Sequence, residues 1–297
     1  MNIYHTSVLL QETLEQLKVK TGKRYIDGTL GGGGHTSEIL KRGGRVLGID
    51  VDEDALEFVR KDLGLKFNDL KIGTDLILIK ENFKHIDTIA KANGFEQVTG
   101  ILLDLGVSSH HLDEAERGFS FQKEGPLDMR MDKELQVKAG DLVNVLTKNE
   151  LYDLFTKFGE ESFARLIASH IVEARKKKRI ETTTELSDII RKAVPFSKKG
   201  INPSTKVFQA LRIVVNDELD SLIELLPKAV SLLESGGRLI IISFHSLEDR
   251  IVKRAFLEFA EAGLGKIMTK KPIVPCEEEI VTNSRARSSK LRVFEKI

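Results

Sequence analysis

Four consecutive glycines, Gly31–Gly34, form the part of the sequence best suited to approach a small molecule. Glycine has no Cβ atom, so its backbone can adopt positive φ and come close to a ligand. The residues from His35 onward read as a helix, and the N–H groups of its first turn would face the same space. Asp50 ends an apolar stretch further along, and α/β proteins use such a distant acid to hold a ribose. The pattern predicts a nucleotide-type ligand, although turns and helix caps also use glycine.

The loop completes neither of the two common phosphate-binding patterns. No register across Gly28–Ser37 satisfies G-x-G-x-x-G, and no lysine follows the loop as a P-loop requires. S-adenosylmethionine (SAM) carries no phosphate, and its cationic amino end and ribose hydroxyls suit nearby acids. Asp27, Asp50 and Asp104 each end an apolar stretch. The sequence therefore favours SAM as cofactor over NAD or ATP.

Strand and helix patterns alternate through the segment that must position these acids. Apolar stretches at 24–27, 46–49, 76–79 and 100–104 alternate with helix patterns at 35, 53–63 and 85–92. Repeated βα units predict an α/β fold with a parallel sheet. Ligands of such sheets bind beyond the carboxyl ends of the strands, where the three acids fall.

A long helical segment separates the fourth strand from the next one. The next strand pattern begins only at Arg238, after a turn predicted at Gly236 and Gly237, whereas a crossover needs roughly one or two dozen residues. Apolar residues spaced by three and four predict helices in between. We infer an inserted helical domain at 114–215, within a sheet domain made of 1–113 and 216–297. A helix is expected from Asn216, kinked or broken at Pro227, then a helix at 246–262 and a last strand at 291–294.

Composition excludes several classes of protein. The 297 residues are 41% hydrophobic, enough for about two domains, and the net charge of +1 argues against a general polyanion binder. The start of the chain shows no secretory pattern and no apolar run reaches membrane length, which predicts a cytoplasmic location. Cys276 is the only cysteine, which excludes an internal disulfide and a thiolate metal cluster. No histidine spacing suggests a metal ligand set, so no metal is expected.

Five longer motifs together resemble a single family. In chain order they are DGTLGGGGH at 27–35, LDLGVSS at 103–109, ERGFSF with GPLDMRMD at 116–132, SFHSLEDR at 243–250 and SRARSSKLR at 284–292. The chain resembles the bacterial small-subunit ribosomal RNA methyltransferase H family, whose members methylate N4 of a decoding-centre cytidine in 16S ribosomal RNA with SAM. The resemblance runs nearly end to end. It implies a Rossmann-like methyltransferase sheet, an inserted helical substrate-recognition domain, and 16S rRNA within the small ribosomal subunit as partner.

The resemblance also implies roles for individual residues. The cofactor residues it predicts are Gly33, Gly34, His35, Asp50, Phe83, Asp104 and His111. His111 stands where many relatives have Gln, and a ring N–H can replace an amide donor. Two residues of the DGTLGGGGH motif also fit purely structural roles. Asp27 equally suits a cap for the glycine loop, and His35 could contribute its backbone N–H alone.

The predicted chemistry needs alignment more than a strong base. The lone pair of cytosine N4 is delocalised into the ring, so the amine must be positioned and its hydrogens held by acceptors. Asp104 and Ser108, at and just after the fourth strand, are the predicted acceptors. The motif of DNA amino-methyltransferases, an acid or Asn with two prolines and an aromatic residue, is absent at this point.

RNA contacts are predicted at Arg130, His245, Arg285 and Arg287. The last two, with nearby Lys and Arg residues, alternate with small residues beside the final strand. The basic run 175–179 reads either as a solvated helix end or as a phosphate contact. A protein that binds SAM and RNA during ribosome assembly without turnover is the alternative function, and an NAD-linked oxidoreductase is disfavoured by the glycine pattern.

Overall fold

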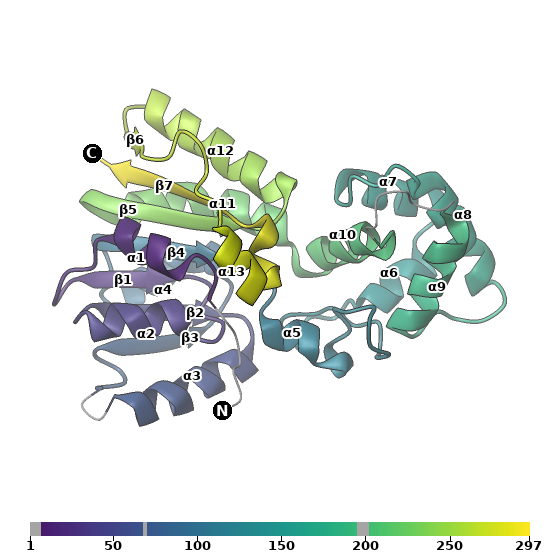
Figure 1. Ribbon diagram of the computed structural model, residues 1–297, viewed down its shortest axis with the longest axis horizontal. Coiled ribbons are helices and arrows are strands. Elements are labelled where there is room, and N and C mark those ends of the chain that lie inside the picture. The colour runs from purple at the N-terminus through teal and green to yellow at the C-terminus, as the bar shows by residue number, and fades with distance from the viewer. Residues whose placement is uncertain (1–6, 68–69, 195–201) are drawn as a thin grey trace. The chain divides into compact units, whose positions relative to one another are not determined.

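The computed structural model describes residues 7–67, 70–194 and 202–297. The chain divides into two compact units (Figure 1). The sheet unit comprises the chain up to Ser108 and from Leu219 to Ile297, and the helical unit comprises Ser109–Glu218. The predicted insertion, 114–215, starts and ends a few residues inside the helical unit.

The sheet unit contains a seven-stranded sheet in the order β3-β2-β1-β4-β5-β7-β6. Five strands run parallel: β1 (Arg24–Asp27), β2 (Arg45–Asp50), β3 (Leu76–Lys80), β4 (Val98–Asp104) and β5 (Leu233–Ser243). β7 (Lys290–Lys296) is antiparallel to β5, and β6 (Gly265–Ile267) is antiparallel to β7. The predicted α/β class is confirmed. The strand order reverses at β1 and β4, so their carboxyl ends form the switch point where open α/β sheets bind ligands.

Helices cover both faces of this sheet, because its strands are apolar on both sides. Tyr25 and Val46 belong to one core cluster, whereas their successors Ile26 and Leu47 belong to the other. The first cluster includes residues of α1 (Leu10–Leu17), α2 (Gly34–Lys41) and α3 (Glu53–Lys66). The second includes residues of α4 (Ile86–Ala92), α11 (Glu218–Leu232) and α12 (Ser246–Glu261). Two 3-10 helices, Phe83–His85 and Ser284–Ser288, and α13 (Glu277–Thr282) complete the unit.

The helical unit consists of short amphipathic helices joined by well-capped turns. Its helices are α5 (Ser109–Asp113), a 3-10 turn (Ala115–Arg117), α6 (Ala139–Val145), α7 (Lys148–Lys157), α8 (Ala164–Arg175), α9 (Thr183–Ala193) and α10 (Ser204–Asn216). Thr147 and Thr182 form capping boxes with Glu150 and Glu185, which fix the starts of α7 and α9. The three-and-four spacing predicted α7, α8 and α9, because the apolar residues of each helix lie on one buried face.

Three local predictions fail or need sharpening. Gly236 and Gly237 make no turn between elements, because β5 already starts at Leu233 and absorbs them in a register shift opposite Val98 and Gly100. Asn216 ends α10 instead of starting the next helix, since Asp217 adopts a left-handed conformation at φ 52°. Helix α11 continues through Pro227.

No helix in the described part of the chain is both long and apolar enough to cross a membrane.

Candidate cofactor site at the carboxyl ends of the strands

The glycine loop joins β1 to α2 and leaves no room for side chains at its end. Gly33 is the N-cap residue of α2, with φ +70°, and a Cβ atom there would lie 2.8 Å from Val59 Cγ2. A Cβ atom on Gly34 would lie 2.0 Å from Ser7 Oγ. The N-cap residue has no side chain to cap α2, so the first turn presents its backbone to the loop edge of the sheet. Gly33 therefore requires glycine because of its positive φ, whereas a Cβ at Gly34 would displace the Ser7 side chain.

Asp27 holds the loop from beneath. Its buried carboxylate accepts hydrogen bonds from Thr36 Oγ1 at 2.7 Å and from the Thr29 backbone N–H at 3.3 Å. Thr29 Oγ1 in turn accepts a hydrogen bond from the Asp104 backbone N–H at 2.6 Å. Burial raises the pKa of Asp27 to about 6, and the charge of Asp104 adds to this rise against the two hydrogen bonds. The contacts match the loop-cap reading of Asp27.

Asp50 fastens the other side of the loop to the end of β2. Its Oδ2 accepts a hydrogen bond from Gly31 N–H at 2.8 Å, and its Oδ1 accepts one from Asp52 N–H at 2.9 Å. A carboxylate oxygen has a second lone pair, so Asp50 can still accept hydrogen bonds from ribose hydroxyls. Phe83 follows the neighbouring strand β3, at the start of a 3-10 helix, and its half-buried ring packs on the core.

The side chain of His35 is buried between two other parts of the sheet unit. Its Nε2 lies 3.2 Å from the carbonyl oxygen of Val8, and its Nδ1 lies 4.0 Å from Asp104 Oδ2. A carbonyl only accepts, so Nε2 carries the hydrogen of that bond. The imidazole thus connects the N-terminal segment to the end of β4. The side chain of His35 therefore has contacts of its own, in addition to any use of its backbone N–H.

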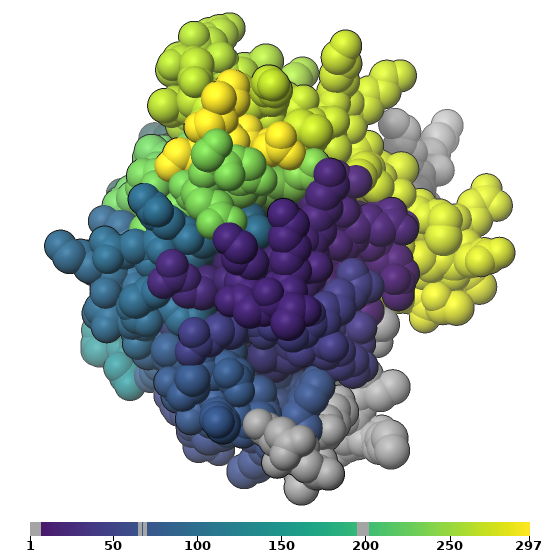
Figure 2. Space-filling model, turned by 90° about the vertical axis from the view of Figure 1, so that its left-hand side faces the viewer, coloured from purple at the N-terminus to yellow at the C-terminus, as the bar shows by residue number. Residues whose placement is uncertain are grey.

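The N-terminal and C-terminal segments lie side by side near this edge. The backbone N–H of Leu9 donates to Glu279 Oε1 in α13 at 2.7 Å. Figure 2 shows the purple N-terminal segment and the yellow C-terminal segment next to each other on one face of the molecule. Two segments distant in sequence therefore meet on this face of the sheet unit.

His245 and Glu248 fix the turn between β5 and α12. The ring Nδ1 of His245 accepts a hydrogen bond from Glu248 N–H at 3.4 Å, and Glu248 Oε2 accepts one from Phe244 N–H at 2.8 Å. His245 Nε2 lies 3.2 Å from Glu248 Oε1, and both side chains are buried. This reciprocal capping gives His245 a structural role at the start of α12.

The C-terminal basic residues differ in their surroundings. Arg292 Nε and Lys290 Nζ donate to Asp249 at 2.6 and 3.2 Å. Burial alone would raise the pKa of Asp249, but these two cations outweigh it and lower the pKa. Arg285 and Arg287 lie exposed on the last 3-10 helix. Among these four, the exposed pair is better placed to meet a phosphate.

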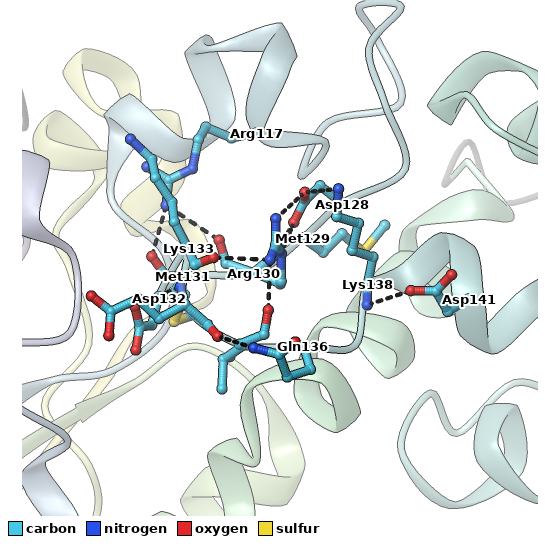
Figure 3. Close-up of polar contacts among 12 residues, drawn as sticks. Arg117, Asp128, Met129, Arg130, Met131, Asp132, Lys133, Gln136, Lys138 and Asp141 are labelled. Carbon is cyan, nitrogen blue, oxygen red and sulfur yellow. Dashed lines mark hydrogen bonds and ion pairs between the residues drawn. The ribbon is translucent and has the colours of Figure 1, made fainter.

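In the helical unit, all three guanidinium nitrogens of Arg130 form hydrogen bonds to neighbouring residues (Figure 3). Its Nε and Nη2 donate to both oxygens of Asp128 at 2.7 and 2.8 Å, and its Nη1 donates to the carbonyls of Lys133 and Leu135 at 2.9 and 2.5 Å. Burial alone would raise the pKa of Asp128, but the hydrogen bonds from Arg130 lower it. Buried Arg117 donates to the carbonyls at 130 and 131, which holds the same turn. RNA binding by Arg130 stays a prediction and would have to coexist with these bonds.

Two other predicted features belong to the helical unit. His111 is buried in α5, where its ring packs on Phe119 with centroids 5.0 Å apart. The basic run 175–179 is largely engaged within the unit: Arg175 donates to the Val143 carbonyl at 2.7 Å, and the other paired members are Lys176 with Glu173, Lys178 with Glu185 and Arg179 with Asp141. These partners favour the reading of this run as a solvated helix end.

The structure thus brings Gly33, Gly34, His35, Asp50 and Asp104 to one edge of the sheet, with Phe83 beyond the adjacent strand. Sequence reasoning missed three side chains that organise this edge and the neighbouring turn, namely Thr29, Thr36 and Glu248. Each lies inside a motif that was noticed, but nothing in the spacing shows its partner. Three features define a Rossmann-like protein of the methyltransferase class: the sheet order, a glycine loop without a phosphate-binding pattern, and the acids at the strand ends.

Comparison with known proteins specifies the family. The model of the MraW methylase family matches residues 2–297. A protein named ribosomal RNA small subunit methyltransferase H from Carboxydothermus hydrogenoformans is 47% identical, over 100% of this chain and 99% of its own length. Proteins of the same name from Acetivibrio thermocellus and Brevibacillus brevis are 46% and 42% identical, each over 100% of this chain and at least 99% of theirs. The chain belongs to the MraW methylase family.

Proposed function

We propose that this chain transfers a methyl group from SAM to the exocyclic N4 of a decoding-centre cytidine in 16S ribosomal RNA. The protein is a SAM-dependent methyltransferase, as its fold and family define. The names of its relatives give small-subunit ribosomal RNA as their substrate. The observation that carries the proposal is the meeting of the glycine loop, Asp50 and Asp104 at the sheet's switch point. A small-subunit substrate implies that the reaction occurs in the cytoplasm.

The residues at this edge fit SAM better than a phosphorylated cofactor. Residues 27–37 contain no lysine or arginine, and the ends of β1, β2 and β4 each carry an acid. Such a set of donors and acceptors suits a cation and ribose hydroxyls but not a phosphate. Gly33 adopts φ +70°, a backbone conformation that favours glycine at the start of α2, where SAM would meet the first turn.

The cofactor residues have separate tasks in this proposal. Gly33, Gly34 and His35 bind the methionine end, Asp50 accepts hydrogen bonds from the ribose, and Phe83 lies beside the adenine. Asp50 is already oriented by two backbone N–H groups, so little ordering remains when it binds the ribose. Asp104, beside the sulfonium, and His111 of the helical unit are the remaining proposed cofactor contacts.

The protein's part in the reaction is mainly positioning. The bound cofactor supplies an activated methyl group. Asp104 and Ser108 accept the hydrogens of the N4 amine, which turns its lone pair toward the reacting carbon. The Asp104 backbone is fixed by Thr29, and its carboxylate faces His35. The acceptor is therefore held before the substrate arrives.

The helical unit has the substrate-recognition role in this proposal, with 1–113 and 216–297 as the cofactor domain and 114–215 as the recognition domain. A base in folded RNA must be turned out to reach a buried methyl donor. Arg130 and His245 take part by shaping the surfaces that meet RNA, and Arg285 and Arg287 contact phosphates. The exposed state of the last two supports their assignment.

The test is transfer of labelled methyl to small ribosomal subunits that lack the modification, in parallel with naked 16S rRNA. Nuclease digestion should release labelled N4-methylcytidine from at least one of the two substrates. Asp104→Asn should lower the rate at least tenfold at saturating SAM, whereas the exposed Asp153→Asn on α7 should leave the rate unchanged. Binding of SAM and RNA without any label in RNA would instead establish the non-catalytic assembly factor.

A further inference from the structure

The carboxylates of Asp27 and Asp104 occupy neighbouring positions on one face of the sheet. Asp27 pairs in register with Leu102 on β4, and Asp104 lies two residues beyond Leu102 along the same strand. Residues two apart on a strand share a face, so both acids point toward the side covered by α2. Thr29 links them further, because its N–H donates to Asp27 and its hydroxyl accepts from the Asp104 backbone.

Asp27 has only neutral partners in this position. Its hydrogen bonds come from the Thr36 hydroxyl and the Thr29 amide, and within residues 7–67, 70–194 and 202–297 no lysine, arginine or histidine forms an ion pair with it. Its relative exposure is 1%. A carboxylate buried to this degree normally has a positive partner or carries a proton.

The ionisable groups around Asp27 come from each neighbouring element. Asp104 on β4 raises the proton affinity of Asp27, and the imidazole of His35 on α2 faces Asp104 at 4.0 Å. Asp50 at the end of β2 directs its carboxylate to the backbone of Gly31 and Asp52. Asp27 and Asp104 are thus two carboxylates on the same face of the sheet, and the charge of Asp104 adds to the effect of burial in raising the pKa of Asp27.

We propose that Asp27 and Asp104 act as one proton-holding pair, with both ionised beside the cationic methyl donor and one proton shared beside the neutral thioether product. The inference rests on the proposed function, which places SAM at this edge. A sulfonium beside the pair favours two negative charges, whereas a thioether offers no charge to balance them. The pair therefore distinguishes donor from product by charge.

The proton balance of the reaction matches this arrangement. The N4 nitrogen gains the methyl carbon and gives up one proton, while the electrons of the broken S–C bond stay on sulfur and the sulfonium charge disappears. If the pair takes up the proton, the net charge of the site is the same before and after transfer. Asp27 is then a positioning residue that acts through Asp104, the group that meets the amine.

The experiment is calorimetric binding of SAM and of S-adenosylhomocysteine, its thioether product, to the full chain between pH 5 and pH 7.5. For the wild type, the Kd of SAM should fall about five- to tenfold as the pH rises from 5 to 7, because each pKa unit of coupling is worth tenfold. The Kd of the thioether should change less than about twofold over the same range. Binding of SAM near pH 6 should also release more protons than binding of the thioether, measured in two buffers of different ionisation enthalpy.

Two variants separate the pair from a general loss of the site. Asp27→Asn should remove the pH-dependent difference between the ligands, while Asp50→Asn should weaken both ligands alike and keep that difference. An equal pH dependence for both ligands in the wild type, or a difference that persists in Asp27→Asn, overturns the proton-holding pair while SAM binding itself stands. Failure of both ligands to bind at any pH overturns the proposed function and this inference together.

Discussion

Replacing Asp27 by Asn should stabilise the protein at neutral pH and destabilise it at acidic pH. The pKa of Asp27 rises on folding from 3.8 to about 6 because the carboxylate is buried. Each pH unit between these values is worth about 1.4 kcal/mol, so keeping Asp27 ionised costs the folded state about 3 kcal/mol above pH 6. The folded state binds the proton of Asp27 more tightly than the unfolded state does. Protonated Asp27 therefore adds fully to the free energy of unfolding below about pH 4, and this stabilisation is lost as the pH rises through about 6.

Asn removes this cost but also one hydrogen bond. A carboxylate accepts from both Thr36 and Thr29, whereas the single amide oxygen of Asn satisfies one of these donors well, at a loss of about 1 kcal/mol. The net expectation for Asp27→Asn is a gain of about 2 kcal/mol at pH 7.5, almost no change at pH 4.5, and a loss of about 1 kcal/mol below about pH 3. The two stability curves should cross near pH 4.5.

Unfolding by urea at several pH values provides the measurement, with hydrogen exchange of β1 and β4 amides to follow the sheet unit separately, since two units need not unfold together. Asp153→Asn on α7 serves as the control, because that carboxylate is exposed and its substitution should leave the pH dependence unchanged. The reasoning fails if Asp27→Asn lowers stability by the same amount at pH 4.5 and pH 7.5. That result would mean that Asp27 is ionised in the fold at no cost.

Three other substitutions test other parts of the molecule. Gly34→Ala should lower SAM affinity at least tenfold in calorimetry, because its Cβ would meet a serine hydroxyl at 2.0 Å. The control Gly64→Ala in α3, with nothing within 4 Å of its Cβ, should retain SAM affinity and add roughly 1 kcal/mol of helix stability. Arg130→Lys cannot reproduce the fork to the neighbouring aspartate and carbonyls and should cost the helical unit about 2 kcal/mol in denaturant unfolding; an unchanged midpoint would contradict that role. The double substitution of Arg285 and Arg287 by Ala should weaken RNA binding and flatten its salt dependence while SAM binding persists, and unchanged RNA affinity would remove this pair from the RNA surface.

The parallel part of the sheet was predictable because its signals are local. Each of the first four strands is a short apolar run, and three of them end in an acid, which marks the carboxyl edge directly. The three-and-four spacing of apolar residues likewise predicts α7 to α9. Short elements without such periodicity, such as α1, β6 and α13, were missed, since their stability comes from contacts with distant segments.

The contacts of the site were less predictable than its members. The sequence places Asp27, His35 and Asp104 near one sheet edge, but it does not show that Thr29 and Thr36 join them or that Val8 meets the imidazole. The same holds for Lys290 and Arg292. The sequence does not distinguish them from Arg285 and Arg287, but in the structure both donate hydrogen bonds to Asp249. Such pairings depend on the packed fold, which single-sequence patterns do not encode.

The buried carboxylate of Asp27 is poorly explained by folding stability alone. The loop could be held by a neutral side chain of the same shape, since its two partners are a hydroxyl and an amide. A residue that costs about 3 kcal/mol in its charged form, where a neutral isostere would cost about 1, points to a need for negative charge at that position. Asp50 shows the contrast, because its carboxylate accepts hydrogen bonds from two backbone N–H groups at the end of β2. A cationic methyl donor beside the ends of β1 and β4 would supply the charge that Asp27 lacks, so the cost in the free protein becomes a gain in the bound one.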